Sequence, residues 1–225
     1  MEIYNLIIEN KDLLKIFYGI LITLICMIIV IKTNKLFKLS SHQGIRYFRN
    51  AFLFYGLAFL MRAFIAAVYL YKFGKFYFLT LNILFEFFLV MAGFFLLYSL
   101  LWKKLDLGPQ KSSLANPSVF IFYIMTFVII LIDQLWQVYY LLFASQIFIF
   151  LCASIISFSN FVTGDSRRRF LKFYFIAMIL SLTAWILNAL AALSLWNQQL
   201  MLDVHLINLV IFFLFLIGVV KITQR

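Results

Sequence analysis

Two charged residues lie inside long apolar stretches, and they are the residues best suited to chemistry. Arg62 and Glu86 each stand twelve residues from Gly74, one before it and one after it. In a helical hairpin that turns near Gly74, a rise of 1.5 Å per residue places both at roughly 18 Å from the turn. A lone Arg at the centre of a membrane helix costs about 2.5–3.5 kcal/mol, and a carboxylate on the neighbouring helix can bind it bidentately. The spacing therefore predicts an Arg62–Glu86 ion pair.

Six further residues with polar side-chain atoms fall in apolar stretches. They lie at the depth of Arg62 and Glu86, or nearer the membrane face at which the Gly74 hairpin turns. They are Asn82, Gln146, Trp185, Asn188, His205 and Asn208. Trp185 and Asn188 are three residues apart, as are His205 and Asn208, so the members of each pair share a helix face. Together with Arg62 and Glu86, these residues predict a polar pocket that opens outward and binds a small polar or anionic solute.

A structural role is the alternative for most of this set. Buried polar side chains join membrane helices by hydrogen bonds worth about 0.6 kcal/mol each, and Asn82, Gln146, Asn188 and Asn208 suit that role. His205 stands near the expected water boundary, where an ordinary interfacial histidine is the simpler interpretation.

Motifs that carry catalysis or bind cofactors do not occur in the sequence. It has no HExxH, GxSxG, CxxC or phosphate-binding glycine loop. Its two histidines are His42 and His205, which do not suit paired haem ligation. The sequence gives only weak support to a metal cluster of Glu86, Asp203 and His205. The pattern predicts no catalytic residues, no metal and no cofactor, and disfavours an enzyme.

The elements that must position these residues are seven long apolar segments. Hydrophobic residues make up 66% of the chain and charged residues only 12%, against about 25% charged in a typical soluble domain. A membrane helix needs about 20 mainly apolar residues. The segments that meet this need are, approximately, residues 13–31, 46–71, 76–101, 118–133, 137–162, 169–194 and 203–220. We expect an all-α polytopic membrane protein, with residues 1–225 forming a single seven-helix transmembrane domain.

The charges between these segments predict the orientation. Basic residues in short loops stay on the cytoplasmic side of a membrane. With the N-terminus outside and the C-terminus inside, the inner loops hold fourteen basic and two acidic residues, and the outer segments hold four basic and five acidic residues. Asp133 and Gln134 mark an outer turn in this arrangement. Most of the net charge of +11 then lies in cytoplasmic loops, which can contact the anionic headgroups of the bilayer. No nucleic-acid partner is needed to explain the charge, and we expect none.

Segments one to three and five to seven have similar loop lengths, which indicates a parallel repeat joined by one linking helix. This three-plus-one-plus-three arrangement resembles microbial rhodopsins and the SWEET sugar transporters in topology only. The final segment has no central lysine to bind retinal. Both prolines, Pro109 and Pro117, lie outside the spans or at a boundary, whereas the SWEET family carries prolines within its repeat helices.

Three functions fit this pattern. The favoured one is a ligand-binding or sensor-like protein of the plasma membrane, with a small-molecule ligand and a cytoplasmic or membrane protein partner. The second is a small-solute transporter or channel, which the repeat favours and the unbroken helices disfavour. The third is a scaffold subunit of a membrane complex, for which two pairs of small residues four apart, Ala63 with Ala67 and Ala153 with Ser157, allow close helix contact.

Overall fold

The computed structural model describes seven α-helices, and the helical class predicted from the sequence is confirmed. The helices are α2 (Lys11–Ser40), α3 (Gln43–Leu70), α4 (Lys75–Leu105), α5 (Pro117–Trp136), α6 (Tyr140–Thr163), α7 (Arg169–Leu193) and α8 (Gln198–Thr223). The described residues are 11–40, 42–71, 74–105, 117–136, 139–163, 169–193 and 198–223. Pro117 is the first residue of α5, where the missing N–H of proline removes no hydrogen bond within the helix.

Six of these helices, α2 to α7, are long and apolar enough to cross a bilayer, and α8 carries a shorter apolar segment, His205–Lys221. Large apolar side chains point away from the bundle on several helices: Phe17 is 66% exposed, Phe120 63% and Phe148 65%. In water such a surface would be unfavourable, whereas lipid solvates it. The chain is an integral membrane protein.

Several predicted boundaries are wrong. Helix α4 ends at Leu105, four residues after the predicted segment, and α8 begins at Gln198, five residues before it. The first apolar segment was expected to end at residue 31, with Lys32, Lys35 and Lys38 in a loop, but α2 continues to Ser40. Lysine is a good helix former, and no Gly or Pro interrupts this region, so the helix persists beyond its apolar part. Asp133 and Gln134 were expected in a turn, but both lie in the last turn of α5.

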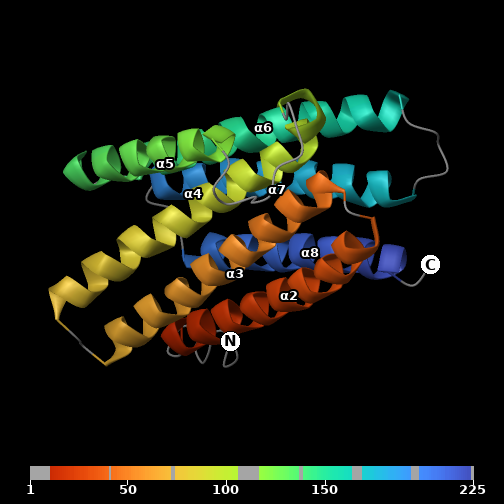
Figure 1. Ribbon diagram of the computed structural model, residues 1–225. Coiled ribbons are helices and arrows are strands. Elements are labelled where there is room, and N and C mark those ends of the chain that lie inside the picture. The colour runs from red at the N-terminus through yellow and green to blue at the C-terminus, as the bar shows by residue number, and fades with distance from the viewer. Residues whose placement is uncertain are drawn as a thin grey trace.

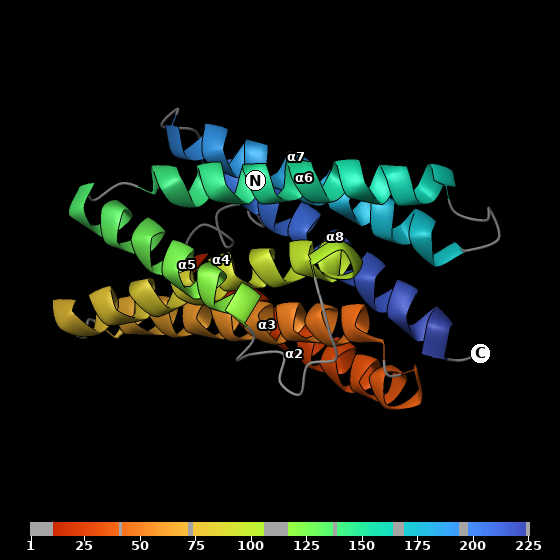
Figure 2. The same ribbon diagram turned by 45° about the horizontal axis from the view of Figure 1, so that its top comes forward.

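Six helices form a closed ring. Along the ring α2 contacts α3, α3 contacts α4, α4 contacts α6, α6 contacts α7, α7 contacts α8, and α8 returns to α2 (Figure 1). The seventh helix, α5, packs on the outside against α4 and α6 (Figure 2). We call the end of the bundle at which α3 ends and α4 begins the α3–α4 end.

Glycine permits a close contact between α2 and α3. A Cβ atom on Gly19 of α2 would lie 2.9 Å from the backbone oxygen of Phe59 and 3.0 Å from Cβ of Ala63, both on α3. The Thr23 hydroxyl of α2 also donates a hydrogen bond to the Gly56 carbonyl of α3, at 3.2 Å. Ala63, one of the small residues expected to permit close approach, thus packs within the chain.

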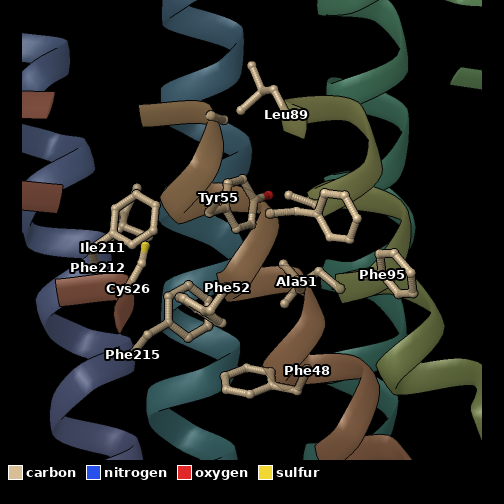
Figure 3. Packing of buried hydrophobic residues seen from close by; sticks show 14 of the residues in the cluster. Cys26, Phe48, Ala51, Phe52, Tyr55, Leu89, Phe95, Ile211, Phe212 and Phe215 are labelled. Carbon is tan, nitrogen blue, oxygen red and sulfur yellow. The ribbon is translucent and has the colours of Figure 1, made fainter. Parts of the chain in front are cut away.

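Aromatic rings fill the space between α3 and α8. The Phe52 and Phe215 ring centroids are 5.0 Å apart in edge-to-face geometry, and Figure 3 shows both rings between the two helices. The Phe59 and Phe212 ring centroids are 5.4 Å apart, also in edge-to-face geometry. Such pairs contribute roughly 0.5–1.5 kcal/mol beyond their buried area. We call this layer of rings, formed by Phe52, Phe59, Phe212 and Phe215, the aromatic floor. The candidate site lies against it.

Candidate functional site

The ring of helices encloses a cavity of about 350 Å³, lined by residues of α3, α4, α6, α7 and α8 and by Tyr139. Five of the eight predicted site residues line it: Arg62, Asn82, Trp185, Asn188 and Asn208. Each of the five is partly accessible. The structure therefore brings these five residues, which come from four helices, around one space.

Arg62 of α3 is held by two neutral side chains. Its Nη2 atom lies 3.1 Å from Nε2 of His205 on α8. The guanidinium carbon lies 6.0 Å from the ring centroid of Tyr18 on α2. A guanidinium can only donate hydrogen bonds, so Nε2 of His205 accepts and the imidazole is neutral in this arrangement.

Tyr18 completes this group from the other side. Its ring centroid lies 4.6 Å from that of His205, with a tilted geometry. Tyr18, Arg62 and His205 thus join α2, α3 and α8. Sequence reasoning missed Tyr18, because a tyrosine in an apolar segment gives no signal of its partner. His205 is a predicted site residue that does not line the cavity; it orients the Arg62 side chain that does.

The predicted ion pair is wrong. Glu86 is 1% exposed, and its Oε1 atom accepts a hydrogen bond of 3.3 Å from Nε2 of Gln134 on α5. Its Oε2 atom has no hydrogen-bond partner among the described residues. Matched depth was predicted from the helical rise, but depth does not fix rotation about the helix axis. Phe85 and Leu89 face the cavity, and Glu86 points toward α5 instead.

A second polar group surrounds Glu86 at the junction of α4, α5 and α6. Asp133, 2% exposed, accepts hydrogen bonds from the backbone N–H groups of Leu141 at 3.0 Å and Leu142 at 2.7 Å. These are first-turn amides of α6, which have no partner within their own helix. Asp133 therefore caps α6 from the neighbouring helix, and is a buried structural acid where the sequence suggested a turn residue.

Tyr139 connects this group to the cavity. It lies between α5 and α6, is about half-buried, and lines the cavity. Burial, together with the charges of Glu86 and Asp133, raises the pKa of its phenol. Tyr139 therefore stays neutral, and can donate a hydrogen bond at the cavity wall throughout the physiological pH range.

The remaining predicted residues differ in their surroundings. Asn82 donates from Nδ2 to the Phe78 carbonyl of its own helix, at 2.9 Å. The rings of Trp185 and Phe143 contact each other edge-on, with centroids 6.2 Å apart. Gln146 is fully buried outside the cavity, where its amide packs against Gly93 and finds no hydrogen-bond partner among the described residues.

Within the described part of the chain, no three His, Cys, Asp or Glu residues are grouped closely enough to hold a metal ion. The side chain of Asp203, the third member of the metal set considered from sequence, lies outside the described residues. Comparison with known proteins adds no further assignment. No protein-family model matches the chain, and no curated protein and no solved structure is significantly similar to it.

Proposed function

We propose that this protein is a ligand-binding, sensor-like protein of the plasma membrane, which binds a small anionic solute in the cavity of its helical ring. The observation that carries the proposal is the position of Arg62. Its guanidinium borders the cavity, and the partners of its hydrogen bond and its cation–π contact, His205 and Tyr18, are neutral.

A cation in this setting favours an anionic ligand. Taking a charge out of water into a bundle of apolar helices is costly unless a counter-charge is present. Within the described residues no carboxylate forms a hydrogen bond to Arg62, and the described acid at similar depth, Glu86, faces α5. A carboxylate or phosphate in the cavity would supply a counter-charge, and Arg can bind either one bidentately.

The amides near Arg62 suit the same ligand. Asn82, Asn188 and Asn208 line the cavity from α4, α7 and α8. Their side-chain N–H groups and the phenol of Tyr139 are donors that complement anionic oxygens. Asn82 uses one of its amide hydrogens within its own helix, so the other remains for the ligand.

The orientation is part of the proposal. With the N-terminus outside and seven crossings, the α3–α4 end faces the exterior and the cavity is reached from there. The excess of basic residues in the loops at the opposite end supports this assignment. The three-plus-one-plus-three repeat is supported by the position of α5, which packs outside the ring formed by α2 to α4 and α6 to α8.

The test is a binding measurement on the protein in lipid nanodiscs, with acetate and inorganic phosphate as the first probes. Trp185 borders the cavity, so ligand entry should change its fluorescence. Arg62→Gln should weaken binding of the anion that gives the signal by roughly 10- to 100-fold, the range for hydrogen bonds to charged groups. Lys221→Gln removes one positive charge from the far end of α8 and should leave the affinity unchanged. Equal affinities for both variants would exclude Arg62 as the anchor.

Transport is the second candidate, because the proposed repeat is common among transporters. Uptake of the bound anion into proteoliposomes would support it, whereas binding without uptake would favour the sensor.

A further inference from the structure

The cavity has a polarity gradient along the bundle axis. On α3, Arg62 lies toward the α3–α4 end, and Phe59 and Phe52 follow at deeper levels. On α8, which runs in the opposite direction, Asn208 lies toward the same end and Phe215 lies deeper. Two antiparallel helices therefore place their polar lining residues at one end and their aromatic residues at the other.

The remaining two helices with lining amides repeat this order. On α4, Asn82 lies toward the α3–α4 end, and Leu89 and Leu96 lie progressively deeper. On α7, Asn188 lies toward that end and Ser181 lies about two turns deeper. The polar atoms of the cavity thus gather at one level, although they come from helices that run in both directions.

Two residues in the deeper part of the cavity carry hydroxyl groups, but neither makes that part strongly polar. Ser181 donates its hydroxyl to the Ala177 carbonyl of its own helix, at 2.7 Å. The Tyr55 hydroxyl is buried and has no hydrogen-bond partner among the described residues. The other described residues that line the deep part, among them Phe52, Leu96 and Phe215, are apolar, so its wall is mainly hydrocarbon.

From this gradient we infer that the ligand is an amphiphilic monoanion, a carboxylate with a single apolar tail, which binds with its head at Arg62 and its tail toward Phe52 and Phe215. This inference rests on the proposed function and specifies its ligand. A fully polar solute would strand hydrogen-bonding atoms against the aromatic floor, at a cost of about 1–3 kcal/mol for each group. A cationic amphiphile would be repelled by Arg62.

The size of the cavity limits the length of the tail. At about 30 Å³ for each water-sized group, 350 Å³ holds roughly a dozen non-hydrogen atoms. Arg62 and Phe52 are ten residues apart on α3, which corresponds to about 15 Å along the axis. Decanoate, with twelve non-hydrogen atoms, suits this space and is the probe of choice.

The experiment measures binding of acetate, hexanoate, decanoate, hexadecanoate and decanol to the protein in nanodiscs, with protein-free nanodiscs to subtract partition into lipid. Each added methylene should strengthen binding by up to roughly 4-fold until the cavity is filled. Decanoate should exceed acetate by at least 100-fold, hexadecanoate should gain little over decanoate, and decanol should bind more weakly than decanoate.

Two variants separate the head from the tail. Arg62→Gln should weaken decanoate by roughly 10- to 100-fold and leave decanol unchanged. Ser181→Phe should fill the deep part of the cavity and weaken decanoate by at least 10-fold while acetate binding persists, which also shows that the variant is folded. Lys221→Gln is the matched control for charge.

The outcomes distinguish this inference from the function on which it rests. Anion binding through Arg62 with no gain from the alkyl tail would overturn the amphiphilic ligand and leave the proposed function standing. Absence of binding by every carboxylate and by phosphate would overturn both.

Discussion

The Nη2 atom of Arg62 lies 3.1 Å from Nε2 of His205, and this contact joins α3 to α8 across the Tyr18 ring of α2. The three side chains meet although α3 and α8 are not neighbours in the ring. Arg62 supplies the positive charge of the cavity, and His205 fixes the direction in which one of its N–H groups points.

Replacing His205 should show how much this contact stabilises the fold. His205→Leu removes the acceptor and leaves one N–H of the partly buried Arg62 guanidinium without that partner, so we expect a loss of about 1–3 kcal/mol in the free energy of unfolding. His205→Gln keeps an acceptor oxygen and should recover most of that loss. Thermal unfolding of both variants in the same detergent measures the difference. Equal destabilisation by the two changes would indicate a packing role for the ring.

Arg62 and Glu86 should behave as independent residues. Because each has a different partner, the effects of Arg62→Ala and Glu86→Gln on unfolding should add to within about 0.5 kcal/mol in a double-mutant cycle. The pair Glu86 and Gln134, which share a hydrogen bond of 3.3 Å, should instead be coupled. A coupling energy above about 1 kcal/mol between Arg62 and Glu86 would contradict the geometry described above.

The contrast between these two pairs shows what the sequence could predict. The position of each helix was predictable because lipid forces backbone polar groups into continuous helices of a set minimum length. The depth of Arg62 and Glu86 followed from the same rise per residue. Their rotation about the helix axes did not, because both helices are apolar on most faces and periodicity is then weak.

The sequence also did not predict which residues of different helices contact each other across the bundle. Gln134 was expected in a turn and proved to be the partner of Glu86, because α5 is one turn longer than its apolar run. The cavity was predicted through its amides and Arg62, whereas its aromatic floor was not. Phenylalanine is common throughout this chain, and most copies serve packing or lipid contact, so Phe52 and Phe215 carried no distinguishing signal.

Asp133 should act as the cap of α6. Asp133→Ala removes the acceptor of two first-turn amides, and we expect a destabilisation of about 0.5–2 kcal/mol, the range for loss of an N-terminal cap. Hydrogen exchange at the amides of Leu141 and Leu142 should accelerate, because both lose their partner. Asp133→Asn keeps one oxygen and should protect at least one of the two amides. Unchanged exchange in the alanine variant would refute the cap.

Labelling of exposed positions at the two ends should reveal the orientation. Leu39 at the end of α2 is 87% exposed and Tyr71 at the end of α3 is 71% exposed. In a background where Cys26 and Cys152 are replaced by alanine, Tyr71→Cys should react with a membrane-impermeant maleimide in intact cells. Leu39→Cys should react only after permeabilisation. The reverse pattern would place the α3–α4 end, and with it Arg62, on the cytoplasmic side.

Of the glycines at the α2–α3 contact, Gly19 should be the least tolerant of substitution by alanine. A methyl group there would lie 2.9 Å from the Phe59 carbonyl oxygen, which belongs to the backbone and cannot rotate away. Gly19→Ala should therefore separate α2 from α3 and cost about 1–3 kcal/mol, the usual effect of overpacking. Gly74→Ala is the matched control, since nothing lies within 4 Å of its added methyl group.

Separation of α2 would also move Tyr18 away from Arg62, so Gly19→Ala should weaken anion binding as well as the fold. Loss of stability with unchanged anion affinity would show that Arg62 is held by α8 alone.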